Sequence, residues 1–267
     1  MLVDDAELAM VAAQAGAAVV RARFGTSLQR FAKSGHDFAT VADIEAEKAI
    51  VEVLRTARPD DAVIGEESGA SGPGVAGRTW LVDPLCGTLN FAARNMLVAV
   101  NVALRVGADV TASATVDPFA DEVFWTDRDR AQVRHAGVDS PLAPSAESRL
   151  VDVDLAPPHP NSRWFRAARL LADDDFAEHF LPRVVSTSLA LVWVAAGRRA
   201  GYVADCELVD NVHFASGIAL CQAAGCVVTD LRGEPVRSGG TTGLVVSADP
   251  EVHAALLAAI GKQLPPG

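Results

Sequence analysis

Residues 79–92 constrain the fold of this chain more than any other stretch, since they read as a strand, a turn and the start of a helix in direct succession. The apolar run 80–82 is typical of a buried strand, and Pro84 favours an extended conformation for Asp83. Residues 87–88 are then predicted to open a helix, whose free backbone N–H groups can bind an anion. A carboxylate beside such a site indicates a metal ion that holds a phosphate-like group.

The chain of 267 residues is acidic, with a formal net charge of −11, and 50% of its residues are hydrophobic. This length and composition suffice for two packed subdomains. The net charge argues against nucleic acid and anionic membranes as partners, and an anionic substrate would need local cations such as bound divalent metals. No apolar run approaches the roughly 18 residues of a membrane helix, and the first residues lack the basic region of a signal peptide. We therefore expect a cytoplasmic protein.

The first half of the chain is predicted to combine helices with an antiparallel sheet. Asp4 or Asp5 can cap a helix that runs to about Phe24. Thr40 and Asp43 have the spacing of a capping box at the start of a second helix. Short runs of strand character, separated by turns, follow this helix. The expected strands are 62–66, 97–105, 111–116 and 122–125, with a glycine- and serine-rich loop at 69–77.

A stretch rich in serine, proline, glycine and alanine at about 137–148 indicates a subdomain boundary. We therefore divide the chain into an N-terminal α+β subdomain, residues 1–140, and a C-terminal α/β subdomain, residues 141–267, which closes the active site. Strand and helix alternate in the second part, so helices are expected to cover a sheet. The expected helices are 161–172, 186–196, 213–224 and 250–261, and the expected strands are 150–155, 201–204, 227–229 and 244–247.

Four segments contain residue types that can carry chemistry, and they are predicted to converge. Taken alone, three of them have ordinary explanations. A Glu-Glu pair after a strand is usually surface charge, Asp43 in a first turn is explained by capping and the helix dipole, and His213 can be an ordinary surface or packed histidine. The four segments are 33–43 with Asp37, 65–68, 79–92 and 213–217.

The segment Asp-Pro-Leu-Cys-Gly-Thr-Leu-Asn-Phe at 83–91 resembles the D-P-x-D-G-T-x-N-F signature of the inositol monophosphatase family. Three more segments follow in the family's order and spacing, so the resemblance covers nearly the whole chain. They are Asp-Phe-Ala-Thr-Val-Ala-Asp at 37–43, Gly-Glu-Glu at 65–67 and Ala-Gly-Cys-Val-Val-Thr-Asp at 224–230. The resemblance implies a layered αβαβα sandwich, often a homodimer, that hydrolyses small phosphate monoesters with Mg²⁺.

The resemblance also implies roles for individual residues. Glu66 and Asp83 look like ligands of a first magnesium ion, together with the backbone carbonyl of Leu85, and Asp83 looks like the bridge to a second ion. Thr88 and Asp43 look like the pair that orients the attacking water.

Other residues of the same segments have supporting roles by the same resemblance. Glu67 looks like an acid behind the metal ligands. The stretch Cys86, Gly87 and Thr88 looks like the cradle that binds the phosphate through its backbone.

Two positions depart from the family's pattern. Cys86 stands where the signature has its second aspartate, and His213 stands where the family has the aspartate of a Trp-Asp-x-Ala-Ala-Gly motif. Asp210 lies three residues before His213 and would need a shifted backbone to substitute. Magnesium prefers oxygen ligands in near-octahedral geometry, so a hard ion at this second position is expected to be lost or weakened.

Three outcomes of this change are open. Cys86 and His213 can recruit a softer ion such as zinc, because thiolate and imidazole suit it. Alternatively no second metal binds, and a protonated His213 supplies the charge or the proton that the leaving oxygen needs. In the third outcome the site is inactive, and the chain only binds a ligand or a partner subunit.

We therefore predict an enzyme that acts on a small phosphate or sulfate ester with a reduced magnesium site. The reaction is either hydrolysis, or displacement of the oxyanion by a nucleophile of the substrate itself, which is the elimination or ring closure of a cyclase. The alternative is a catalytically silent pseudophosphatase subunit.

Overall fold

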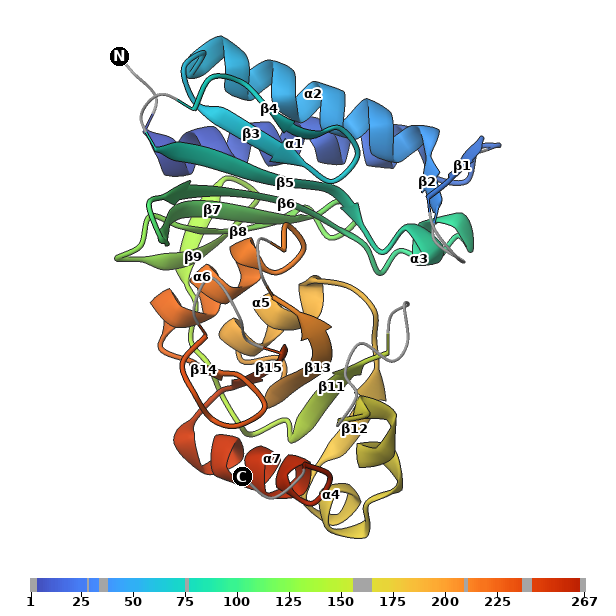
Figure 1. Cartoon of the computed structure of the whole chain (residues 1–267), viewed down its shortest axis with the longest axis vertical. Coiled ribbons are helices and arrows are strands. Elements are labelled where there is room, and N and C mark those ends of the chain that lie inside the picture. The colour runs from blue at the N-terminus through green and yellow to red at the C-terminus, as the bar shows by residue number, and fades with distance from the viewer. Residues whose placement is uncertain are drawn as a thin grey trace. The chain divides into compact units, whose positions relative to one another are not determined.

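The computed structural model describes residues 4–27, 29–33, 38–74, 77–155, 165–208, 211–236 and 242–264. These residues form two compact units, which we describe separately (Figure 1). Unit 1 contains residues 1–141 together with 187–189 and 212–223. Unit 2 contains residues 142–186, 190–211 and 224–267.

The centre of unit 1 is an eight-stranded sheet with the order β10-β9-β8-β7-β6-β5-β3-β4. Neighbouring strands are antiparallel except for β3 and β5, which are parallel. The strands are β3 (Ala62–Gly65), β4 (Gly69–Ser71), β5 (Arg78–Cys86), β6 (Ala99–Val106), β7 (Asp109–Asp117), β8 (Glu122–Thr126), β9 (Ala131–His135) and β10 (Val138–Pro141).

Two long helices, α1 (Asp5–Arg23) and α2 (Val41–Ala57), cover one face of this sheet (Figure 1). Asp4 caps α1, and the predicted capping box of Thr40 and Asp43 begins α2. The two helices approach closely at Gly16, where a Cβ atom would lie 2.7 Å from Ile50 Cδ1. The opposite face packs through Leu81 and Ala103 against the start of α6 (Ala215–Ala224).

Two smaller elements of unit 1 flank the sheet. The strands β1 (Arg30–Ala32) and β2 (Phe38–Thr40) form an antiparallel pair directly before α2. The short helix α3 (Thr88–Ala92) follows β5. Both elements therefore place chain segments near the end of β5 that carries Asp83.

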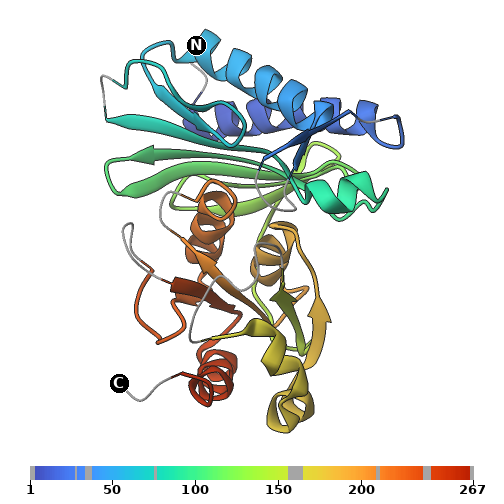
Figure 2. The ribbon, with the colours of Figure 1, turned by 45° about the vertical axis from the view of Figure 1, so that its right-hand side comes forward.

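Unit 2 is built on a five-stranded mixed sheet with the order β12-β11-β13-β15-β14 (Figure 2). Strand β11 is parallel to β12 and β13, and β15 is antiparallel to β13 and β14. One core of the unit joins the sheet to α7. The elements are β11 (Leu150–Asp154), the 3₁₀ helix η1 (Ala167–Ala172), α4 (Asp174–His179), β12 (Leu181–Val184), α5 (Leu189–Ala195), β13 (Gly201–Glu207), β14 (Val227–Thr229), β15 (Thr242–Ser247) and α7 (Pro250–Gly261).

Several sequence-based expectations need correction. The segment 69–77 is not only a loop, since Gly69–Ser71 is strand β4. The helix expected at 161–172 is a 3₁₀ helix from Ala167, and residues 161–164 lie outside the described ranges. The expectation of a loop-like boundary at 137–148 overlooked β10. Backbone pairing with a neighbouring strand stabilises such short segments, and composition does not reveal it. Within the described ranges, no helix is long and apolar enough to cross a membrane.

Candidate functional site

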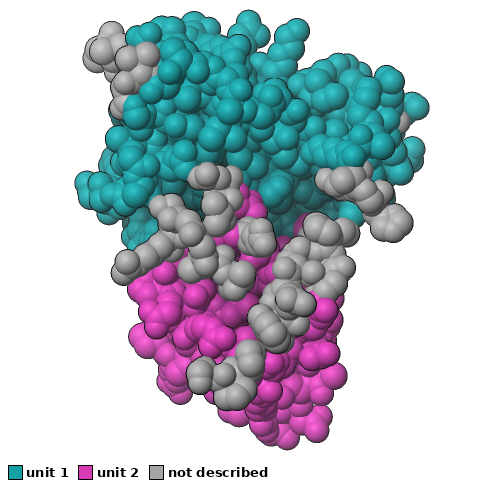
Figure 3. All heavy atoms as spheres, in the orientation of Figure 1, with its two compact units in different colours: residues 1–141, 187–189, 212–223 teal, residues 142–186, 190–211, 224–267 magenta. Residues whose placement is uncertain are grey.

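All the site residues described below belong to unit 1, including those from the segments 187–189 and 212–223 (Figure 3). Asp83 is the buried centre of the site. Its pairing with β6 shifts register just beyond it, which is where a strand tolerates a proline such as Pro84. Asn101 Nδ2 donates to Asp83 Oδ2 at 3.2 Å, and the Leu85 N–H donates to Oδ1 at 3.2 Å.

The charge state of Asp83 follows from its partners. Burial raises its pKa, but the positive charge of His213 and the hydrogen bonds outweigh burial, so the pKa of Asp83 lies below its usual value. The carboxylate is therefore ionised although it is fully buried. A buried carboxylate of this kind requires a cationic partner.

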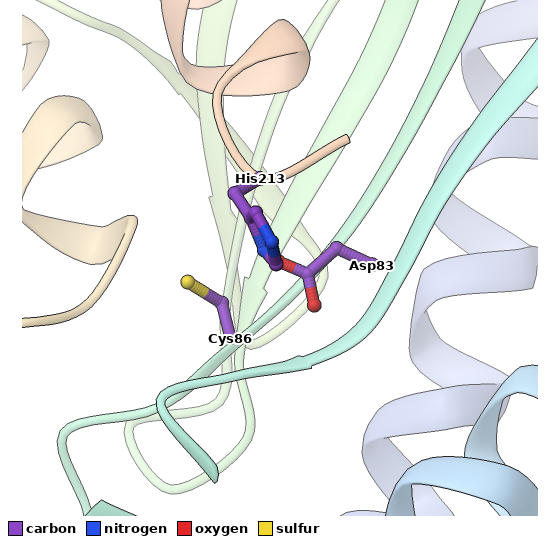
Figure 4. A group of neighbouring side chains, drawn as sticks. All are labelled: Asp83, Cys86 and His213. Carbon is purple, nitrogen blue, oxygen red and sulfur yellow. The ribbon is translucent and has the colours of Figure 1, made fainter. Parts of the chain in front are cut away.

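His213 supplies that partner from the segment just before α6 (Figure 4). Its Nδ1 lies 2.8 Å from Asp83 Oδ2, while 38% of its side chain is exposed. Burial lowers the pKa of His213, but the negative charge of Asp83 and the hydrogen bond between them raise it well above 6.5. In this state the pair is an imidazolium and a carboxylate.

Cys86 completes a cluster with these two residues (Figure 4). The Ser188 N–H donates to Cys86 Sγ at 3.2 Å. Burial and the charge of Asp83 raise the pKa of the Cys86 thiol, so the sulfur is protonated here. One potential ligand atom each from Asp83, Cys86 and His213 lies within 4.8 Å of the other two.

Glu66 and Glu67 follow β3, and both form ion pairs with the side chain of Lys33. Lys33 Nζ lies 2.7 Å from Glu66 Oε1 and 2.6 Å from Glu67 Oε1. Burial and the negative charge of Asp83 raise the pKa of Glu66 to about 8, although His213 and Lys33 oppose this. The other oxygen, Glu66 Oε2, is buried and accepts no hydrogen bond from the described residues. An orphaned carboxylate oxygen near a second carboxylate is a fitting ligand for a hard divalent cation.

Asp43 and Thr88 form a hydrogen-bonded pair, as the sequence analysis predicted for a water-orienting group, although the role itself stays a prediction. Thr88 Oγ1 lies 2.9 Å from Asp43 Oδ1 and 3.2 Å from the carbonyl oxygen of Leu85. Asp43 Oδ2 accepts from both the N–H and the hydroxyl of Thr40. Burial raises the pKa of Asp43, and these hydrogen bonds oppose the rise.

The predicted phosphate cradle lies where β5 turns into α3. Gly87 has a φ of 102°, and a Cβ at this position would lie 2.9 Å from the carbonyl oxygen of Leu97, so the turn requires glycine. Helix α3 begins at Thr88 as predicted, but it contains only five residues. Its macrodipole is accordingly small, and any anion here would depend on individual N–H groups.

Glu47, which was not among the residues predicted for the site, holds the segment that carries Glu66 and Glu67. Its Oε2 accepts from the Glu67 N–H at 2.8 Å and its Oε1 accepts from the Ser68 N–H at 2.9 Å. Glu47 lies one helical turn after Asp43 on α2, and both side chains are buried. Two acidic residues at i and i+4 on the buried side of a helix were the available signal.

A second missed group is a buried polar network centred on Asn101. Its amide nitrogen lies 2.7 Å from Ser188 Oγ as well as 3.2 Å from Asp83 Oδ2, and its oxygen accepts from Thr115 at 2.9 Å. Thr115 Oγ1 lies 2.8 Å from Ser216 Oγ, on α6. The network thus links the strands β5, β6 and β7 to two other segments. One contains Ser188, whose N–H donates to Cys86, and the other contains His213 and the start of α6. A polar residue at the centre of an otherwise apolar strand, Ala-Val-Asn-Val-Ala, was the signal.

The potential metal ligands of the site divide into two groups, according to the kind of cation that each group binds best. Glu66, Asp83 and the carbonyl of Leu85 offer the oxygen ligands that magnesium prefers. Cys86 and His213 offer sulfur and nitrogen, which do not suit magnesium. The candidate acids Asp37 and Asp210 lie outside the described residues. The individual ligand roles stay predictions.

Comparison with known proteins places this site in context. A model of the inositol monophosphatase family matches residues 2–264. An inositol-1-monophosphatase of Caulobacter vibrioides is 31% identical over 210 residues, which cover 77% of this chain and 80% of that protein. The probable inositol 1-monophosphatase ImpA of Mycobacterium tuberculosis is 34% identical over 234 residues, which cover 86% and 84%. The crystal structure of the extragenic suppressor protein suhB from Bartonella henselae superposes with a TM-score of 0.84 at 26% identity, covering 97% of this chain and 98% of that one.

These likenesses confirm the predicted fold class, a layered α+β sandwich of mixed sheets and helices. They also support a phosphatase-like function, because the family acts on small phosphate esters and generally uses Mg²⁺. Because the family model matches residues 2–264 and a relative is 34% identical, the chain belongs to the inositol monophosphatase family.

Proposed function

We propose that this chain is an enzyme that acts on a small phosphate or sulfate ester with a reduced metal site. The observation that carries the proposal is the hydrogen bond from Thr88 to the buried carboxylate of Asp43, beside the acidic pair Glu66 and Asp83. Because Asp43 accepts the hydroxyl proton of Thr88, the lone pairs of Thr88 Oγ1 are left to act as acceptors. A water that donates to them would have its own lone pair free for attack.

The surrounding residues have distinct roles in this proposal. A magnesium ion held by Glu66, Asp83 and the Leu85 carbonyl would supply electrostatic polarisation of the ester when bound. Backbone N–H groups of the segment 86–88 stabilise the charge that develops on the transferring group. Glu67 shares the cation Lys33 with Glu66 and so fixes the position of that ligand.

His213 has the role that a second hard ion would otherwise have. As an imidazolium beside Asp83, it places one positive charge where the leaving oxygen becomes negative, and it can donate a proton to that oxygen. Hydrolysis is the default reaction of this arrangement. Displacement of the oxyanion by a nucleophile of the substrate, with ring closure, is the variant that needs no activated water.

The rival proposal is a catalytically silent subunit that uses the same pocket to bind a ligand or a protein partner. Several relatives of 29–32% identity are named Nus factor SuhB, a name that describes no phosphatase activity. The rival predicts no turnover of any ester and no stabilisation by Mg²⁺. Assembly as a homodimer and a cytoplasmic location are further proposals, and light scattering of the purified chain checks the first.

Turnover of a panel of phosphate and sulfate monoesters tests the proposal. Phosphate release should be lost in Glu66→Gln and Asp83→Asn and reduced in His213→Ala, while Asp109→Asn, in an exposed ion pair, should match the wild type. Thermal denaturation with Mg²⁺ provides the second readout, since a ligand at 100 times its Kd adds about 2.7 kcal/mol of stability. Full activity in Asp83→Asn would exclude the proposed site, and absence of both turnover and stabilisation would favour the silent subunit.

A further inference from the structure

We infer that Asp83, Cys86 and His213 form a binding site for a thiophilic divalent ion of the zinc class, which shares Asp83 with the proposed magnesium ligands and adds the sulfur of Cys86 and the nitrogen of His213. The three side chains present an oxygen, a sulfur and a nitrogen, all within 4.8 Å of one another. Zinc accepts these donor types and commonly takes three protein ligands with the fourth position left to water or substrate.

The geometry of the ligands agrees with one ion between them. His213 Nδ1 and Asp83 Oδ2 are 2.8 Å apart in a direct hydrogen bond, and they need to separate only to about 3.4 Å to ligate one tetrahedral ion. The side chain of His213 is partly exposed, which gives an ion access from solvent. Binding would replace the proton on Cys86 and the proton shared by His213 and Asp83, and both would be released to solvent.

Hydrogen bonds to two of the three ligands are the second observation. Metal ligands are normally held by outer hydrogen bonds that fix their orientation. Here Asn101 Nδ2 donates to the Asp83 carboxylate, and the Ser188 N–H donates to the Cys86 sulfur. Asn101 itself is held by Thr115 and is fully buried. Two of the three ligands therefore have rigid donors behind them before any ion arrives.

The occupied site would also change the chemistry proposed above. An imidazole that ligates an ion is neutral, so His213 would no longer supply a positive charge or a proton of its own. The ion would carry that charge instead. Zinc-class ions are thus expected to alter the rate of any turnover, although binding is the property that defines the site.

Titration of the purified, metal-free chain with Co²⁺, as a spectroscopic substitute for zinc, tests the inference. We expect a thiolate-to-cobalt charge-transfer band at a stoichiometry of one ion, displaced by Zn²⁺ and not by Mg²⁺ in excess. Cys86→Ser should abolish the band, and Cys226→Ser, a thiol of unit 2, should leave it unchanged. Asn101→Ser should weaken the affinity by about 10–100-fold, the usual cost of losing an outer partner of a ligand.

A second measurement uses the wild-type chain alone and so does not depend on the folding of a variant. Zn²⁺ should protect Cys86 from alkylation, mapped by mass spectrometry, and leave the reaction of Cys226 unaffected. A charge-transfer band that persists in Cys86→Ser, or a Cys86 that is alkylated without Zn²⁺ and to the same extent with it, would overturn the inference. Neither result bears on turnover, so the failure of this site and the failure of the proposed function can be told apart.

Discussion

Replacement of Glu47 by alanine is predicted to loosen the turn that carries Glu66 and Glu67. The Glu47 carboxylate accepts the N–H groups of Glu67 and Ser68, at 2.8 and 2.9 Å. Hydrogen bonds to charged groups contribute about 1.5–3 kcal/mol each. Ser68 is exposed, so water can replace its partner, whereas the N–H of Glu67 is partly buried. We therefore expect a loss of about 2–4 kcal/mol in the free energy of unfolding.

Glu47→Gln keeps the volume of the side chain and changes only its hydrogen bonding. Glu47→Gln retains one acceptor oxygen and turns an NH₂ group toward the other N–H, so it should lose about 1–2 kcal/mol. Gly65→Ala provides an independent perturbation, because its Cβ would lie 2.5 Å from Glu47 Cδ and must displace the carboxylate. The two alanine variants combined should therefore cost less than the sum of their separate losses.

Urea denaturation checks these values through tryptophan fluorescence in a Trp164→Phe, Trp193→Phe background, where the signal comes from Trp80 and Trp125, which are buried in unit 1. Glu52→Gln, an exposed position on the same helix, is the control and should change stability by less than about 0.5 kcal/mol. The titration of Mg²⁺ should also shift to higher concentrations in Glu47→Ala, since Glu66 loses its fixed position. Wild-type stability in Glu47→Ala, or simple additivity with Gly65→Ala, would refute the reasoning.

Three further outcomes are expected. Gly87→Ala should destabilise the chain by at least about 1 kcal/mol more than Gly107→Ala in urea denaturation, because both have positive φ but only Gly87 also meets a backbone oxygen. Thr40→Ala should cost about 1 kcal/mol through the lost cap of α2, checked by thermal denaturation, and an unchanged midpoint would contradict this. Burial lowers the pKa of His253, so its neutral form stabilises the folded state above about pH 6.5 and this contribution is lost as the pH falls further. Stability should therefore decline less steeply between pH 7 and 5 in His253→Asn than in the wild type.

Local chemistry made much of the fold predictable. The capping box of Thr40 and Asp43 located α2, and the apolar runs located β5 to β8. The strands β1, β2, β4, β9, β10 and β12 escaped prediction because none contains a run of three apolar residues, and partner strands rather than their own composition stabilise them. The segment 186–196 was predicted as one helix, but only Leu189–Ala195 is helical, since the residues before it bind back to unit 1.

The structure brings together several residues that the sequence singled out, whereas the residues that hydrogen-bond to them were not predicted. Glu66, Asp83 and His213 were singled out through the resemblance to the family's motifs, and their individual roles stay predictions. Lys33 and Asn101 could not be assigned a partner, since their contacts join segments far apart in the chain. A sequence pattern records which groups are present, whereas the pairing of Lys33 with two glutamates depends on how β1 and β3 are brought together.

The membership of residues 187–189 and 212–223 in unit 1 has a consequence for biosynthesis. A nascent chain that has emerged only as far as residue 141 lacks Ser188, His213 and Ser216, so Asn101 and Asp83 would have fewer polar partners at that stage. The acidic centre can mature only after most of the polypeptide has left the ribosome. A fragment that ends at residue 141 should accordingly regain this arrangement only when the remaining residues are supplied in trans.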